Sequence, residues 1–462
     1  MGFNSIEFLI FFPVVAVLYF VLPHRVRWAW LLACSYCFYM FWHPAYILLL
    51  LASTLIDYLA GLLLGRSTHG GLRRTCVAAS LAGNLGMLAV FKYWNFFMGS
   101  LDAMDLAAGP LHNLLLPIGL SFYTFQSLSY TFDVYRGDRA PESHFGRFAL
   151  YVAFFPQLVA GPIERSTRLL PQFVVPQSPD YGRIADGLKR MAWGFFKKLV
   201  IADQLGRYVD LVYGDPTAHA GLPIWIATYA FAFQIYCDFS AYTDIAIGAA
   251  RVLGIRLMEN FRHPYGATSV RDFWRRWHIS LSTWFRDYLY VPLGGSRRGV
   301  GRLCLNLLVV FVLAGLWHGA NETFLVWGLL HAGYLLAGRL VPDGVIRWAA
   351  SAFGRWVAAL LTFHLVCIGW VLFRAESLGH AGEVFRSALT TGALPQLAPG
   401  LWVAFLMLGV MHVVERIAES AAQRAAFFAR PAWQRWICYY ALGAIILIFG
   451  RSDPRMFIYF QF

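Results

Sequence analysis

An all-helical bundle that crosses a membrane many times is the fold class this sequence predicts, and three observations lead to it. Hydrophobic residues make up 59% of the 462 residues and charged residues 14%, with a mean hydropathy of +0.55, unlike a soluble domain of this length. The apolar residues gather in runs that approach the roughly 20 residues needed to span a bilayer. Several runs are short or end at proline, which favours re-entrant and interfacial helices around a cytoplasmic funnel. We count roughly eleven to thirteen membrane segments in one domain over residues 1–462.

Five apolar runs are expected in the N-terminal third, at residues 8–22, 28–41, 45–64, 75–91 and 114–130. The first is followed by Pro23-His24-Arg25 rather than by a small-residue cleavage site, so it is a retained span with its N-terminus outside. The second and third form a short re-entrant or tilted pair, in which Asp57 is expected to serve packing rather than catalysis. An aromatic belt (Tyr93, Trp94, Phe96, Phe97) and a loop or interfacial stretch at 101–110 follow the fourth run.

The middle of the chain mixes helices with polar connections. A helix over residues 148–160 ends at Gly161-Pro162, where proline lacks an amide hydrogen. Residues 170–186 are expected to form a cytoplasmic loop, and 189–202 an amphipathic interfacial helix. Two spans, 222–237 and 242–253, are expected to meet at a turn carrying Asp238 and Asp244. Each acid is either exposed there or buried against an arginine such as Arg275 or Arg286, and exposure is favoured more for Asp244. Later spans are expected at 303–316, 324–340, 356–373, 402–417 and 433–449.

Residues 271–295 stand out because aromatic residues and arginines alternate at helical spacing. On a 3.6-residue period one face carries Phe273, Trp277, Leu281, Trp284 and Tyr288, and another carries Asp272, Arg275, Arg276, Ile279, Thr283 and Arg286. This pattern predicts one helix that is too polar to span lipid. An interfacial helix, with its rings at headgroup level, accounts for most of the pattern without any chemistry.

The net charge of +13 is concentrated in the same region. Residues 256–302 hold nine arginines against Glu259, Asp272 and Asp287, so six of the thirteen net positive charges lie there. Basic residues between apolar runs indicate cytoplasmic loops rather than a nucleic-acid site. The segment suits an anionic cytosolic donor such as a coenzyme A thioester, and anionic lipid headgroups explain the charge equally well.

His318 ends an apolar run, where an ionisable side chain is costly to bury. An imidazole there can take a proton from a nucleophile and pass it to a leaving group, and Gly315, Gly319 and Ala320 would let a substrate approach the ring. A histidine that bonds a backbone carbonyl in a helix bundle is the alternative, and spacing alone does not separate the two. His331 follows thirteen residues later without the spacing of a zinc motif. The seven cysteines are scattered, and we expect no bound metal.

Several blocks together resemble the membrane-bound O-acyltransferase family, in particular its bacterial branch of alginate O-acetylation and teichoic-acid D-alanylation proteins. They are residues 3–9, 91–97, 117–126, 154–163, 234–240, 271–295, 315–321 and 369–375, with the aromatic tail 456–462. The resemblance implies that His318 is the catalytic residue and that His278 is a second polar residue of the reaction chamber. Glu322 departs from the pattern, where a large aromatic residue is expected; it either alters the chamber mouth or faces water.

The resemblance also implies an activity. We expect an acyltransferase, with acetyl favoured, that takes its acyl group from a cytosolic thioester such as acetyl-CoA and binds no cofactor. It would serve O-acetylation of an exported polysaccharide such as alginate or cellulose, from the bacterial inner membrane, with an extracytoplasmic acetyltransferase or secretion-complex subunit as partner. His318 and His278 are the expected catalytic residues; Arg275, Arg286, Trp317, Asn321 and Asp238 are expected to contact substrate. D-alanyl transfer to teichoic acid and a non-catalytic acyl or lipid conduit are the alternatives.

Overall fold

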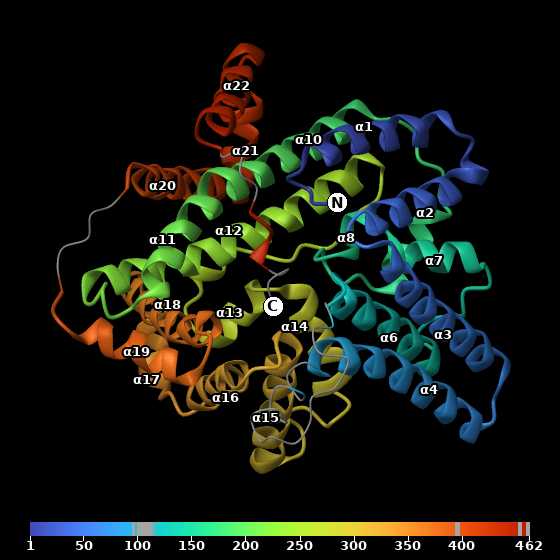
Figure 1. Cartoon of the computed structure of the whole chain (residues 1–462), viewed down its shortest axis with the longest axis horizontal. Helices are drawn as coiled ribbons and strands as arrows, with labels where there is room; N and C mark the ends of the chain where they lie inside the picture. Colours follow the sequence, from blue (N-terminus) through green and yellow to red (C-terminus); the bar gives the residue numbers. More distant parts are fainter. Residues whose placement is uncertain (95–97, 99–113, 115, 393–397, 451–454, 459–462) are drawn as a thin grey trace. The chain divides into compact units, whose positions relative to one another are not determined.

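The computed structural model describes residues 1–94, 98, 114, 116–392, 398–450 and 455–458, and within these ranges the chain forms helices and no strand (Figure 1). This confirms the predicted all-helical class. The contacts divide the chain into two compact units: unit 1 comprises Met1–Gly187 and Ala246–Val366, and unit 2 comprises Leu188–Ile245 and Cys367–Gln461. The expectation of a single domain stays a prediction. Phe96, Phe97, the stretch 101–110 and the tail residues 459–462 lie outside the described residues.

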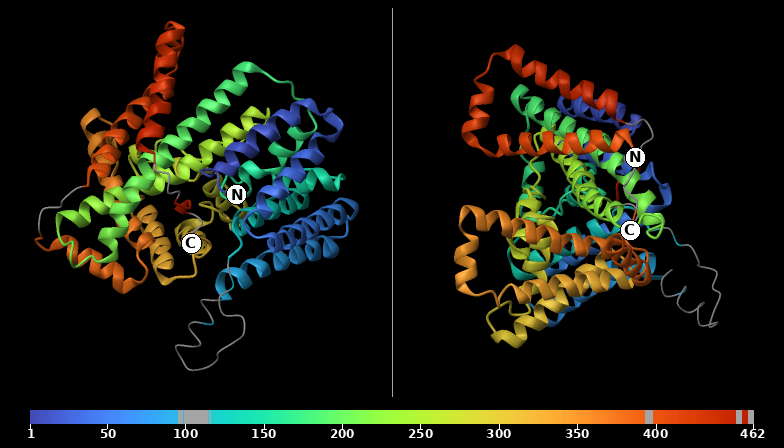
Figure 2. Two further views of the ribbon diagram at one scale, coloured as in Figure 1. Left: turned by 45° about the horizontal axis from the view of Figure 1, so that its top comes forward. Right: turned by 90° about the vertical axis from the view of Figure 1, so that its left-hand side faces the viewer.

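Unit 1 holds most of the helices. In chain order they are α1 (Ile6–Val21), α2 (His24–Met40), α3 (Ile47–Arg66), α4 (Gly70–Leu88), the π-helical η2 (Ala89–Tyr93), α6 (Leu120–Arg136), α7 (Phe145–Ala153), α8 (Phe155–Leu158), α9 (Ser166–Leu169), α13 (Val270–Arg276), α14 (Ile279–Phe285), the π-helical η6 (Arg286–Tyr290), α15 (Gly299–His318), α16 (Glu322–Ala337) and α17 (Asp343–Ala349). Helices α3, α4 and α6 pack together, and α15 and α16 form a hairpin (Figure 2).

Unit 2 contains η4 (Lys197–Ala202), α11 (Asp203–Gly214), α19 (Leu378–Leu389), α20 (Pro399–Glu419), α21 (Ala421–Phe428) and α22 (Ala432–Phe449). Three helices, α10 (Tyr181–Phe196), α12 (Leu222–Val252) and α18 (Ala352–Arg374), run from one unit into the other.

Six described helices are long and apolar enough to cross a membrane: Pro44–Arg66, Gly70–Tyr93, Gly299–His318, Ala352–Arg374, Pro399–Ala418 and Ala432–Phe449. Ile6–Val21 and Glu322–Ala337 are apolar but shorter. These are fewer than the membrane segments expected from the sequence. Two expected spans are one helix, α12, and the expected segment 148–160 is broken between α7 and α8. The length and composition of these helices confirm a polytopic membrane protein.

The expected turn at Asp238 and Asp244 is wrong, because α12 continues for 31 residues from Leu222 to Val252. Its only proline and glycine, Pro223 and Gly248, lie near its ends, so nothing in the intervening sequence interrupts the helix. Asp238 is buried within unit 2, where its Oδ1 receives a bond from Lys198 Nζ at 2.6 Å. Its partner is therefore this lysine and not an arginine of residues 271–295.

The single helix predicted over residues 271–295 is also wrong. The chain breaks between α13 and α14 at His278, whose φ of 44° lies in the left-handed region. The predicted aromatic face is nonetheless buried at Phe273, Trp277, Leu281 and Trp284. Arg275 and Arg286 are exposed, so the division into buried and exposed faces survives the break.

A buried polar group joins α3, α4 and α6. The Asp57 carboxylate accepts bonds from Ser80 Oγ, from Asn84 Nδ2 at 2.7 Å and from Thr131 Oγ1 at 2.7 Å. Inside a membrane such bonds replace the water that an acid would otherwise need. The packing role expected for Asp57 therefore agrees with its contacts.

Candidate active site

His318 is the last residue of α15, and it is held there by an unusually close approach of α16. A Cβ added to Gly315 would lie 2.3 Å from the carbonyl oxygen of Phe324, and one added to Gly328 would lie 2.3 Å from that of Phe311. Small residues let two membrane helices approach in this way. At Gly315 and Gly319 the space expected for a substrate is therefore occupied by α16: by the Phe324 backbone and the Phe324 ring, respectively.

Aromatic rings surround His318, which is 6% exposed. Its ring centroid lies 4.8 Å from Trp317, 5.2 Å from Trp327 and 6.4 Å from Phe324. Trp317 is itself buried, and its expected contact with substrate stays a prediction. The surroundings exclude bulk water from the imidazole, which strengthens any hydrogen bond that it forms with a substrate.

Two residues of η2 complete this end of α15, and the sequence reasoning assigned them no role in the site. The Lys92 ammonium donates to the carbonyl of Trp317, and the Tyr93 hydroxyl donates to that of Leu316 at 2.6 Å. These are last-turn carbonyls that lack a helical partner. The Lys92 ammonium also lies 5.8 Å from the Trp317 ring centroid. The sequence signal that could have identified Lys92 as part of the site is a lysine placed between an apolar run and an aromatic cluster.

His278 also lies near Trp317. Its ring centroid is 5.9 Å from that of Trp317 and 6.2 Å from that of Phe122 on α6. The side chain is 1% exposed, and burial lowers the pKa of its imidazole to about 3, so the ring is neutral near pH 7. Its Nδ1 lies 3.2 Å from Oδ1 of Asn260. The structure thus brings both predicted histidines and Trp317 together.

The other expected substrate contacts lie elsewhere or have a structural partner. Asn321 caps α16, because its Oδ1 accepts from the Thr323 amide at 3.0 Å. Arg275 is exposed on α13. Asp238 belongs to unit 2, bound to Lys198 and to the amide of Ile458 at 2.6 Å. The roles assigned to these residues stay predictions.

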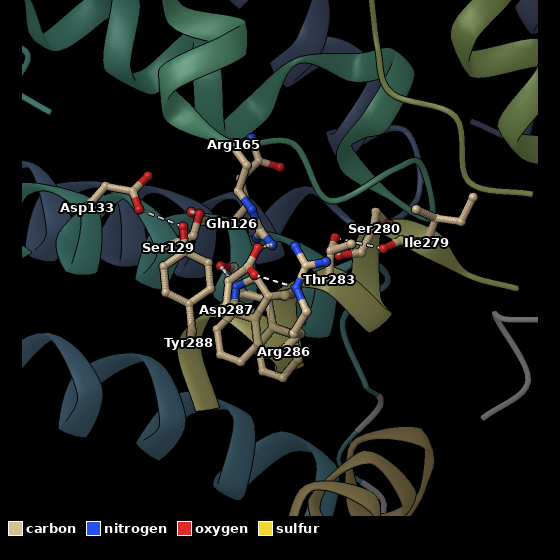
Figure 3. A network of polar contacts seen from close by, with 12 residues as sticks. Gln126, Ser129, Asp133, Arg165, Ile279, Ser280, Thr283, Arg286, Asp287 and Tyr288 are labelled. Carbon is tan, nitrogen blue, oxygen red and sulfur yellow. Dashed lines mark hydrogen bonds and ion pairs between the residues drawn. The ribbon is translucent and has the colours of Figure 1, made fainter. Parts of the chain in front are cut away.

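Arg286 belongs to a polar network around Tyr288 (Figure 3). Its Nε donates to Asp287 at 2.7 Å, and Arg165 lies 3.6 Å from the other oxygen of the same carboxylate. The Tyr288 hydroxyl donates to Asp133 at 2.6 Å, and Arg165 lies 4.7 Å from the Tyr288 ring. Of the two arginines in this network, Arg286 is exposed and Arg165 is mostly buried.

A row of stacked rings connects this network to the histidines. Trp284 lies 5.2 Å from Tyr288, and it stacks on Phe125 at 4.1 Å with 6° between the planes. Phe125 lies in turn 5.7 Å from Trp317. The rings are rigid and bury large areas, so α6, α14 and α15 are held in a defined relation around the site.

His331 has a packing environment of its own. Trp274 Nε1 donates to its Nδ1 at 3.3 Å, and its ring lies 5.1 Å from Trp274 and 4.9 Å from Trp327. Among the residues that the structure describes, no group of three or more His, Cys, Asp or Glu side chains is placed to hold a metal ion. Glu322 is exposed in the first turn of α16.

The chain is similar to known proteins over most of its length. The model of the membrane-bound O-acyltransferase family matches residues 140–375, which include both histidines. The probable alginate O-acetylase AlgI of Azotobacter vinelandii is 40% identical over 403 residues, covering 85% of this chain and 79% of that protein. A peptidoglycan O-acetyltransferase of Helicobacter pylori is 32% identical over 464 residues, covering 94% of this chain and 86% of that protein.

A more distant relative is the teichoic acid D-alanyltransferase of Bacillus subtilis, 28% identical over 285 residues, which are 59% of this chain and 72% of that protein. The family match and these identities confirm the resemblance found in the sequence. The chain belongs to the membrane-bound O-acyltransferase family and is a multi-pass membrane O-acyltransferase.

Proposed function

We propose that this O-acyltransferase passes acetyl groups from a cytosolic thioester toward O-acetylation of an exported polysaccharide. The observation that carries the proposal is the pair His278 and His318, both buried and with ring centroids 5.9 Å and 4.8 Å from that of Trp317. Two relatives align with 85% and 94% of this chain, and their names are probable alginate O-acetylase and peptidoglycan O-acetyltransferase. These names support acetyl as the transferred acyl group and a glycan as the acceptor. An acetyl-CoA donor, an inner-membrane location and an extracytoplasmic partner that completes the transfer are parts of the same proposal.

In the proposed reaction His318 is the general base. It takes the proton of an acceptor hydroxyl while that oxygen attacks the carbonyl carbon of the thioester. The new carbon–oxygen bond replaces the carbon–sulfur bond, and the departing thiolate receives the proton from the imidazolium. His278 orients the donor beside Trp317. Because the surrounding rings exclude water, the thioester is protected from hydrolysis while it waits for the acceptor.

Peptidoglycan is a second candidate destination, favoured by the Helicobacter pylori relative, which aligns with 94% of this chain. D-alanyl transfer to teichoic acid has less support, because that relative aligns with 59% of the chain. The three destinations differ in acceptor, and teichoic acid differs also in its acyl group, so analysis of the esters on each polymer separates them.

The test is the O-acetyl ester content of exopolysaccharide and of peptidoglycan in the native host that carries wild-type protein, His318→Ala or His331→Phe at equal membrane levels. His331 is the matched control, because it is another buried histidine of unit 1 with an aromatic surrounding. We expect His318→Ala to lose the ester on one polymer and His331→Phe to keep it. Unchanged ester with His318→Ala would remove this residue from the mechanism. Full activity of His318→Gln, or lost secretion with normal esters, would favour a conduit.

A further inference from the structure

Asn260 is a buried residue, 0% exposed, that gathers several hydrogen bonds around the break at His278. Its Oδ1 lies 3.1 Å from the backbone nitrogen of Ser280, 2.9 Å from the Ser280 hydroxyl and 3.2 Å from His278 Nδ1. Its backbone carbonyl accepts from the Ile279 amide at 2.9 Å. Asn260 therefore holds the first turn of α14 by side chain and backbone together.

These contacts determine the proton on His278. A backbone amide can only donate, so the Asn260 atom that faces the Ser280 amide is the carbonyl oxygen and not the NH2 group. A carbonyl oxygen can only accept, so the Nδ1 of His278 must carry a hydrogen. In a neutral imidazole only one nitrogen carries a hydrogen, and Nε2 is then the acceptor.

The surroundings keep this imidazole neutral. Burial is the cause of its lowered pKa. The titratable neighbour with which it interacts is His318 on α15, and α6 presents the uncharged Phe122. A positive charge on His318 would oppose a second one on His278. A neutral His278 with a hydrogen on Nδ1 cannot donate through Nε2.

We propose that Asn260 is a positioning residue for acyl transfer, which holds His278 in the Nδ1–H tautomer so that His278 Nε2 enters the reaction as a hydrogen-bond acceptor. The role in the reaction rests on the proposed function; the tautomer does not. His278 then does not polarise the carbonyl of the thioester through an N–H group. It accepts a hydrogen bond from an N–H or O–H group of the acyl donor and so orients the donor beside Trp317, while the single hydrogen of the attacking hydroxyl goes to His318.

Asn260 also explains the backbone at His278. A φ of 44° is rare for a residue with a side chain, and such strain persists where the surroundings determine it. The bonds from Ile279 and Ser280 to Asn260 follow the strained residue directly. The same residue therefore sets both the ring's tautomer and the turn that aims it.

The direct test is solid-state nitrogen NMR of protein labelled with ¹⁵N-histidine in lipid, with His278→Gln used to identify the His278 signals by difference. We expect a protonated Nδ1 and an unprotonated Nε2 in the wild-type protein. Asn260→Asp keeps the acceptor and adds a charge, so its imidazolium should appear at a higher pH than in wild type. Asn260→Leu should lose the single tautomer. Ser280→Ala, which removes another donor to the same oxygen, should leave the His278 signals unchanged.

The second readout is the O-acetyl ester content of the same variants in the host at equal membrane levels. We expect Asn260→Leu to lower it at least about tenfold, and Ser280→Ala to stay within about twofold of wild type. A protonated Nε2 in wild type, or Asn260→Leu with the wild-type spectrum or with full ester, would overturn the proposal. Normal ester in His318→Ala would instead overturn the proposed function while the NMR result still decided the tautomer.

Discussion

The close contact between α15 and α16 predicts that adding one methyl group at Gly315 will damage the active site. The Cβ of alanine would lie 2.3 Å from the carbonyl oxygen of Phe324, whereas ordinary contacts begin near 3.4 Å. The obstacle is backbone, so it cannot turn aside as a side chain can, and α16 must move by about 1 Å. Overpacking of this kind costs about 1–3 kcal/mol. Helix propensity returns up to about 1 kcal/mol when glycine becomes alanine.

Gly333 on α16 is the matched control, because a Cβ there meets nothing within 4 Å. Gly333→Ala should therefore be neutral or stabilising by up to about 1 kcal/mol. Between Gly315→Ala and Gly333→Ala we expect a difference of about 1–3 kcal/mol in the free energy of unfolding. Activity should fall further, since displacing catalytic groups by about 1 Å can cost about a hundredfold in rate.

The assay is the thermal stability of both variants in detergent, followed by size-exclusion of the folded fraction, together with ester content in the host at equal membrane levels. Gly315→Ala should melt at a lower temperature than Gly333→Ala and should lose most of its ester. Equal melting temperatures and equal ester content in the two variants would refute the argument that close packing of α15 on α16 positions His318.

Three further predictions concern the buried groups outside the histidine pair. Lys198 bridges the buried acids Asp203 and Asp238, so Lys198→Met leaves both without a cation and should destabilise the protein by about 3–5 kcal/mol. The measurement is the folded fraction that remains after heating. Wild-type melting of Lys198→Met would show that these ion pairs are dispensable. Burial raises the pKa of Glu164 to about 7 from its ordinary value of 4.5, so the folded state holds this proton more tightly. Stability should therefore fall by about 3 kcal/mol as pH rises from about 4.5 through 7. Glu164→Gln should remove that part of the pH dependence in melting curves; an unchanged pH profile would contradict the shift. His331→Phe should keep at least about half of the wild-type ester content, because the ring's surroundings are aromatic; loss of ester at normal membrane level would give His331 a role in the reaction.

In residues 271–295 the buried face was predictable from the sequence, but the break in the helix was not. Periodicity identified the buried face at Phe273, Trp277 and Trp284, because burial of an apolar ring depends on which side of the chain it occupies. It did not reveal the break at His278. That break depends on Asn260, which lies eighteen residues earlier in the chain, and no local pattern encodes such a partner.

Asp57 and Asp238 likewise show which features the sequence pattern identifies and which it does not. The sequence pattern favoured a packing role for Asp57, which its contacts support, and left Asp238 either exposed or buried against an arginine, whereas its partner is a lysine. The sequence pattern could not identify Asn84 or Lys198 as the partners of these acids, since they lie 27 and 40 residues away. It also placed a turn where α12 continues, because two charges in an apolar stretch resemble a solvent-exposed connection until their partners are known.

The sequence by itself determined the all-helical membrane class and the family, because hydropathy, periodicity and local motifs are properties of neighbouring residues. Only the tertiary structure decided which side chains meet. In the structure His278 lies beside Trp317, Asn260 is the hydrogen-bond partner of His278, and a neighbouring helix fills the space at Gly315. The physical reason is that hydrogen bonds and close packing join residues far apart in the chain, and their partners are selected by how the whole bundle assembles.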